Sequence, residues 1–170
     1  MKYLYCCKKA QFSSDVEKNS MCASVKVFTP KIKKLLLCGE KKNIKTLIVR
    51  LLFQIRTKGK AKIYYVADEN KLKHTSYVVP RCGKFPFLDE NDYEIGPCFT
   101  YPDHRGKGIY PEVLRFICCH IGDHNTTFYM IVDEKNIASI KGIEKAGFKK
   151  CGVVEVSKLT KRYKLCRKYR

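Results

Sequence analysis

The sequence predicts an α/β fold in which helices flank a mixed sheet. Three observations support this prediction. The chain has 170 residues, which is enough for one domain with a buried core. The first part of the chain contains mainly strand patterns. It is followed by a strand, a helix, a strand, a helix and two final strands, and this order of elements is typical of a mixed sheet. No internal repeat or low-complexity segment interrupts the chain, so we expect residues 1–170 to form one domain.

The first half of the chain predicts strands around one helix. Apolar residues recur at three- and four-residue spacing from Ile44 to Ile55, so residues 43–60 are the clearest helix. Asn43 is its predicted N-cap, and Gly59 its predicted end. We expect this apolar stripe to lie in the core, although docking on a membrane surface stays open because basic residues lie nearby. The predicted strands cover 2–7, 24–30 and both arms of 61–80.

The second half contains an interrupted strand at 92–100. Gly96 and Pro97 break its alternation, and proline cannot donate to a strand ladder. We therefore expect a bulge there, or a strand that peels away from its neighbour. A glycine-containing turn then leads into a helix from about Tyr110 to Ile121. The remaining predicted elements are a nearly all-apolar strand at 126–133, a helix between Asn136 and Gly147, and a final pair of strands.

The charge balance favours anionic partners. Lys and Arg number 35 against 16 Asp and Glu, which gives a formal net charge of +19. A field of this sign attracts phosphorylated cofactors, nucleic acid, acidic lipid or anionic sugars, and it repels polycationic substrates. A solvated basic surface without a single partner stays open.

The ten cysteines favour free thiols. No secretory apolar region follows Met1 and no C-x-x-C spacing occurs, so we expect a reducing, cytoplasmic location. The longest apolar runs are too short to cross a bilayer. One cluster of residues could ligate zinc, but no second pair of ligands lies at the spacing of a zinc finger. We therefore expect no metal. That cluster comprises Cys118, Cys119, His120 and His124.

The turn "HRGKGIY" has the features of an anion site. The first N–H groups of a helix lack internal partners and carry the positive end of the helix dipole. Gly106 and Gly108 have no Cβ to block an approaching anion, and Arg105 and Lys107 add charge. We predict a phosphate or pyrophosphate site here, although a plain basic hairpin turn stays open on this stretch alone. The spacing does not fit a P-loop or a dinucleotide fingerprint.

Two stretches carry a family resemblance: "YEIGPCFTYPDHRGKGI" and "NIASIKGIEKAGF", with the strand "FYMIVD" between them. In this order they resemble the GNAT superfamily of acyl-CoA N-acetyltransferases over roughly residues 61–165. Residues 1–60 match loosely and would be a variable part of the same domain. The resemblance implies acetyl-CoA as the acyl donor, a mostly antiparallel sheet that is splayed at the cofactor site, and a turn that binds pyrophosphate through backbone amides. The cofactor-binding residues it implies are Cys98, Phe99, Thr100, Arg105, Gly106, Lys107, Gly108, Ile109, Tyr110, Asn136 and Ser139.

Glu94 is the predicted catalytic base. Transfer to an amine requires a group that removes the amine proton. Glu94 lies just before the Gly-Pro break and resembles the catalytic glutamate of some family members. By the two-residue period it would share a face with Cys98 and Thr100 if no bulge shifts the phase. A solvated strand glutamate is the open alternative.

The catalytic acid departs from the family pattern. The usual tyrosine on the last helix corresponds to Ile143, and the leading Gln or Arg of the turn corresponds to Asp103. The candidate acids are therefore Tyr110, which we predict to be catalytic, with Ser139 and Tyr129 as alternatives.

The charge favours an anionic acceptor, such as an acidic or nucleotide-linked amino sugar, and we expect residues 74–87 to line its pocket. The alternative function is a non-catalytic, basic nucleic-acid-binding module on a GNAT-like scaffold, to which the C-terminal "KRYKLCRKYR" would contribute. We regard nucleic acid as the less favoured partner. A homodimer and a membrane-surface contact through 43–60 stay open.

Overall fold

The structure is a computed structural model that describes residues 1–12, 24–31, 36, 43–69 and 71–169. Across these residues the strands form one sheet in the order β2-β3-β4-β5-β6-β1-β7-β8. All neighbours are antiparallel except the parallel pair β5 and β6. The predicted mixed, mostly antiparallel sheet is therefore confirmed. The strands are β1 (Lys2–Lys8), β2 (Val25–Phe28), β3 (Lys62–Asp68), β4 (Lys71–Pro80), β5 (Tyr93–Thr100), β6 (Thr127–Asp133), β7 (Lys149–Val156) and β8 (Tyr163–Lys168).

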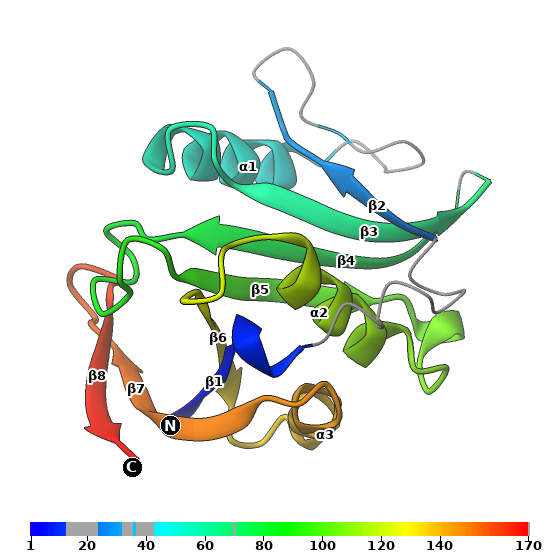
Figure 1. Ribbon diagram of the computed structural model, residues 1–170. Coiled ribbons are helices and arrows are strands. Elements are labelled where there is room, and N and C mark those ends of the chain that lie inside the picture. The colour runs from blue at the N-terminus through cyan, green and yellow to red at the C-terminus, as the bar shows by residue number, and fades with distance from the viewer. Residues whose placement is uncertain (13–23, 32–35, 37–42, 70, 170) are drawn as a thin grey trace.

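Three helices pack around this sheet in the described part of the chain: α1 (Ile44–Arg56), α2 (Ile109–His120) and α3 (Ile137–Lys145). Side chains of α2 and α3 share the main core cluster with one face of the sheet, and Figure 1 shows α2 in front of that face. A smaller cluster on the other face joins Val79 of β4 to Phe85 and Leu88 of the 81–92 loop and to Phe53 of α1. No helix of the described residues has the length and hydropathy needed to cross a bilayer.

The strand β1 lies inside the sheet, between β6 and β7, and is antiparallel to both. Its Leu4 and Tyr5 side chains are buried. Just after the strand, the Lys9 ammonium donates to the carbonyls of Cys119, Ile121 and Gly122 at 2.9 Å each, which ties β1 to the end of α2. Cations are favoured there because the last carbonyls of a helix carry its negative pole. The sequence predicted this strand but not its place.

The strand β5 is bulged and separates from β6, as predicted. Cys98 pairs with Ser76 of β4 and Ile95 pairs with Val78, so Gly96 and Pro97 together oppose the single residue between those partners. On the other side, β5 pairs with β6 only at Tyr93 and Glu94. In the part of the chain that the structure describes, no strand therefore pairs with this edge of residues 95–100, and the sheet opens between β5 and β6.

The bulge also determines the face on which Glu94 lies. Glu94 pairs with Val79, which belongs to the smaller cluster, whereas Ile95 and Cys98 both pack toward the α2 face. One extra residue in the bulged strand reverses the alternation of side chains. Glu94 therefore lies on the opposite face from Cys98 and Thr100, because the condition for the predicted shared face, a strand without a bulge, is not met.

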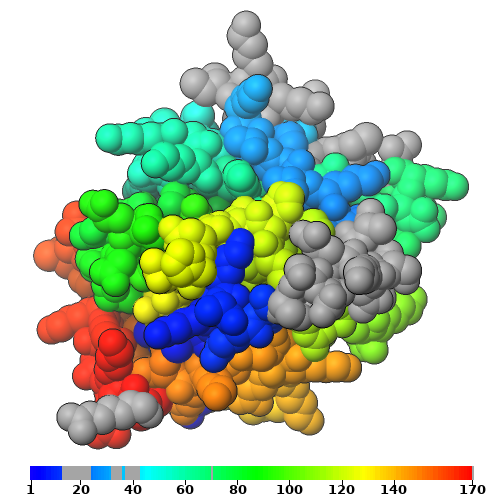
Figure 2. Space-filling view, viewed as in Figure 1, coloured from blue at the N-terminus to red at the C-terminus, as the bar shows by residue number. Residues whose placement is uncertain are grey.

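The helix α1 has its predicted N-cap, because the Asn43 side chain accepts from the Lys45 N–H at 2.9 Å. The predicted burial of its apolar stripe was wrong. The buried side chains of α1 are Arg50 and Gln54, whereas the stripe that includes Ile44 and Ile55 is exposed. Figure 2 shows the cyan atoms of α1 at the outer margin of the molecule. Periodicity predicts an apolar face but not which way that face points.

Candidate active site

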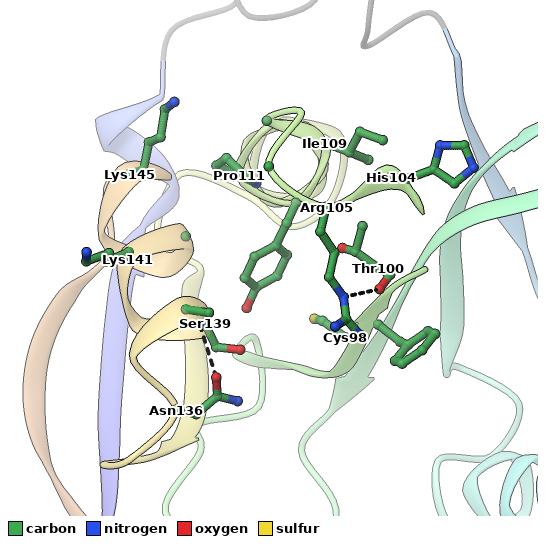
Figure 3. A pocket seen from close by; sticks show the side chains of 16 residues that line it. Cys98, Thr100, His104, Arg105, Ile109, Pro111, Asn136, Ser139, Lys141 and Lys145 are labelled. Carbon is green, nitrogen blue, oxygen red and sulfur yellow. Dashed lines mark hydrogen bonds between the residues drawn. The ribbon is translucent and has the colours of Figure 1, made fainter. Parts of the chain in front are cut away.

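A cleft of about 580 Å³ lies where the open edge of β5, the start of α2 and the start of α3 meet (Figure 3). Every residue predicted to bind the cofactor lines this cleft except Lys107, and the role of these residues in binding stays a prediction. The sequence analysis missed Lys141 and Lys145, which lie four residues apart on α3 and add positive charge to the far wall. Asp103 is exposed and lies outside the lining, so its charge does not face the cleft.

The turn before α2 leaves its backbone accessible. Gly106 and Gly108 have φ angles of 74° and 76°, in the left-handed region that favours glycine. A Cβ built on either residue would meet no atom within 4 Å, so the space beside the backbone is open. The first bond of α2 runs from the Glu112 N–H to the Gly108 carbonyl. Within the described residues, no acceptor bonds the N–H groups of residues 106–110.

Arg105 adds a fixed cation beside these N–H groups. Its Nε donates to the Thr100 carbonyl at 3.0 Å, and its guanidinium lies 5.8 Å from the centre of the Phe99 ring. Both contacts anchor the side chain to the end of β5, at the mouth of the cleft (Figure 3). Because this bond uses Nε, it leaves the terminal N–H groups of the guanidinium available to an anion.

Asn136 and Ser139 face the cleft from the start of α3. The Asn136 Oδ1 accepts from the Ser139 N–H at 3.2 Å, which makes Asn136 the N-cap that the sequence predicted. Figure 3 shows both side chains on the wall opposite β5. The cap holds the first turn of α3 in place, so it also fixes this wall of the cleft.

A buried polar chain beneath the cleft was not predicted. His74 Nδ1 lies 2.7 Å from Thr100 Oγ1, and His74 Nε2 lies 2.7 Å from Ser76 Oγ. Ser76 then donates to the Cys98 sulfur at 3.2 Å. Burial lowers the pKa of His74 to about 4, so the ring is neutral at pH 7. Ser76 gives its proton to sulfur, and we therefore assign the ring proton to Nε2.

Tyr110 brings a phenol to the same sulfur. Its hydroxyl interacts electrostatically with the Cys98 thiol, and its ring lies 5.7 Å from the ring of His74. A Cβ on Gly142 of α3 would lie 2.5 Å from the ring, so only a residue without a side chain leaves room for the phenol at this position. Burial raises the pKa of Tyr110 well above its ordinary range, so the hydroxyl keeps its proton. Ile143, where the family resemblance places a tyrosine, is buried in the core.

Glu94 is a buried carboxyl on the other face, at the last pair before β5 leaves β6. Burial raises its pKa to about 8, although the charge of Lys84 acts in the opposite direction. Its Oε2 has no hydrogen-bond partner in the part of the chain that the structure describes. A Cβ on Gly96 would lie 2.8 Å from Oε1, so the carboxyl lies against the bulge itself. It is not part of the cleft lining.

The sequence and the fold of this chain were compared with those of known proteins. No protein-family model and no curated protein matches this sequence. Solved structures do match. An acetyltransferase of the GNAT family from Colwellia psychrerythraea matches with a TM-score of 0.60 and 17% identity, over 88% of this chain and 52% of its own. A conserved protein described as functionally unknown, from Staphylococcus epidermidis ATCC 12228, matches with a TM-score of 0.55 and 9% identity, over 88% of this chain and 57% of its own.

This chain thus spans little more than half the length of either solved structure. At such low identity the likeness concerns the fold. The arrangement of strands and helices described above is that of the GNAT acetyltransferases, and this chain has the GNAT fold.

Proposed function

We propose that this chain is an N-acetyltransferase that moves an acetyl group from acetyl-CoA to an amine. The observation that carries this proposal is the set of unbonded N–H groups at residues 106–110, which open onto a cleft of about 580 Å³. Backbone N–H groups at the positive end of a helix are suited to a diphosphate. Cys98, Phe99 and Thr100 of β5 also line the cleft, and no strand of the described residues pairs with this edge of β5.

The residues present fit such a donor. The N–H groups of residues 106–110 would bind the diphosphate, with Arg105 on one side and Lys141 and Lys145 on the other. The free edge of β5 would pair with the amide groups of the extended arm, as an added strand does. The donor supplies the acetyl thioester. The protein has to orient it, stabilise charge and move protons.

Glu94 and Tyr110 would act from opposite faces of the sheet, Glu94 on the amine and Tyr110 on the sulfur. An amine attacks only when neutral, and free alkyl amines with a pKa near ~10 are mostly protonated at pH 7. Glu94 is a buried carboxyl with a raised pKa at the split, so it can take the amine proton from the face opposite the donor. Tyr110 keeps its proton and can donate a hydrogen bond to the departing sulfur.

We further propose an anionic acceptor, such as an acidic or nucleotide-linked amino sugar. The acceptor would approach on the face of Glu94, where the 81–92 loop packs. Lys84 is the cation of that loop whose charge reaches Glu94, and its ammonium lies 5.3–5.6 Å from the rings of Phe53, Phe85 and Tyr163. A cation fixed this close to the base would bind an acidic group beside the reacting amine.

The donor site can be tested by thermal melting with acetyl-CoA. Saturation at 100-fold above Kd should stabilise the protein by about 2.7 kcal/mol. Gly106→Asn and Gly108→Asn should lose this shift, because asparagine tolerates the left-handed backbone while its side chain covers the N–H groups. Lys107→Ala is the matched control, because Lys107 lies outside the cleft lining, and it should keep most of the shift.

A melting shift with single-stranded RNA but not with acetyl-CoA would contradict the donor site. It would favour the nucleic-acid-binding alternative instead. Equal acetyl-CoA shifts in the wild type and both Asn variants would also contradict the assignment of these N–H groups.

The pH dependence of kcat/KM tests Glu94. The carboxyl must be ionised to accept a proton, so the rate should rise with pH and level off above about 8. Glu94→Gln should lower kcat by on the order of 10²–10⁴-fold and remove this dependence. Because acceptor amines titrate too, the profile should be measured with amines of different pKa. The rise in kcat/KM that reflects Glu94 should occur at the same pH with every amine.

The same substitution has a stability signature. The folded state favours the protonated carboxyl, so the stability from this group is full below the ordinary pKa of glutamate and is lost as the pH rises through about 8. Glu94→Gln should therefore make melting less dependent on pH in that range. A variant with wild-type kcat and an unchanged pH profile would exclude Glu94 as the base.

Tyr110→Phe should lower kcat with little change in acetyl-CoA binding, because the hydroxyl acts on the departing sulfur. Gly142→Ala should have a similar effect, since the added methyl meets the Tyr110 ring. Single-turnover rates measure the chemical step, and unchanged rates in both variants would exclude Tyr110.

Acceptor charge can be tested with Lys84→Met. The variant should raise KM for a nucleotide-linked amino sugar by about tenfold, with little effect on the KM of a neutral amino sugar. Because Lys84 lowers the pKa of Glu94, the rise of kcat/KM with pH should also move to higher pH in this variant. Equal KM changes for both acceptors would contradict an anionic substrate.

A further inference from the structure

The helix α1 presents an apolar stripe to the outside of the molecule. Ile44, Ile48, Leu52 and Ile55 are 72%, 51%, 42% and 64% exposed. Their spacing of four, four and three residues places them on one side of the helix. Exposed apolar side chains are ordinary when scattered, but a contiguous stripe indicates a surface that meets another apolar phase.

Polar contacts fix the orientation of this helix. On its inner side, Arg50 Nε donates to the Tyr77 hydroxyl at 2.8 Å, and Gln54 Nε2 donates to the Ala61 carbonyl at 2.9 Å. Both side chains are buried. A roll that buried the stripe would break these bonds and leave buried polar groups unpaired, which costs about 1–3 kcal/mol each. The stripe is therefore held outward.

The surroundings of the stripe are cationic. Lys45 and Arg56 lie on the helix beside it, and Lys58 and Lys60 follow directly; all are exposed. The helix contains no Asp or Glu. An apolar stripe bordered by Lys and Arg is the pattern of helices that lie in the interface of a membrane with anionic lipid.

We propose that the stripe of α1 docks this protein on an anionic phospholipid surface. The helix has 13 residues, which spans about 20 Å at 1.5 Å each and falls short of a bilayer core of about 30 Å. It therefore lies in the plane of the interface. The apolar side chains enter the acyl boundary, and the neighbouring cations meet the lipid phosphates.

Charge argues against a second copy of the chain as the occupant. A two-fold pairing brings the same face of both copies together. Because the only charged side chains of α1 are cations, Lys45 and Arg56 would meet like charges. A stable protein interface also needs about 20–30 residues on each side, whereas this stripe is one helix wide.

The test is sedimentation with vesicles of equimolar phosphatidylcholine and phosphatidylglycerol, and with phosphatidylcholine alone. A net charge of +19 gives any variant some electrostatic attraction, so the informative substitution keeps the charge. Combined Ile44→Ser, Ile48→Ser and Ile55→Ser should weaken binding to the mixed vesicles by on the order of tenfold or more. Leu159→Ser, which removes another exposed apolar side chain, is the matched control and should bind like the wild type.

A second readout reports insertion. The chain has no tryptophan, so Ile48→Trp gives a single fluorophore in the stripe. Its emission should shift to the blue with mixed vesicles, and that of Leu159→Trp should not. Equal binding of the triple Ser variant and the wild type, or no blue shift at Ile48→Trp, would overturn the proposal. A dimer in solution that the triple Ser variant dissociates would also overturn it.

Discussion

The arrangement of the site depends on the point where β5 leaves β6. One extra residue at Gly96 and Pro97 ends the pairing with β6 after Glu94 and reverses the side-chain alternation. The open edge of β5 then borders the cleft, and Cys98 turns toward α2 while Glu94 stays on the opposite face. A regular strand would close the gap and would place both side chains on the same face. Under the proposed function, this split would let a donor on one face meet an acceptor on the other.

The local chemistry of the cleft could be predicted from the sequence because it depends on neighbouring residues. The turn around Gly106 and Gly108 opens backbone N–H groups to the cleft, and Asn136 caps the next helix, as the residue types indicate. The GNAT resemblance added the expectation that the sheet is splayed at the cofactor site. The break in β5 was also predicted, because proline cannot serve in a continuous ladder.

The features that the sequence did not predict depend on distant partners. The outward side of α1 is set by Arg50 and Gln54, whose partners lie in β4 and in the residue before β3. Glu94 and Cys98 lie on opposite faces because the bulge adds one residue to β5, and the bulge is defined only by the pairing of β5 with β4. His74 was missed because its two partners come from β4 and β5, although its two-residue spacing to Ser76 was a visible signal. Such contacts become evident only once the strands are paired.

Backbone NMR during a CoA titration tests most directly whether the N–H groups of residues 106–110 bind a diphosphate. If they do, the amide signals of Gly106 and Gly108 should shift with CoA and saturate, and inorganic pyrophosphate should move the same signals. The diphosphate site would be contradicted if these two signals stayed in place at saturating CoA while signals elsewhere in the chain moved.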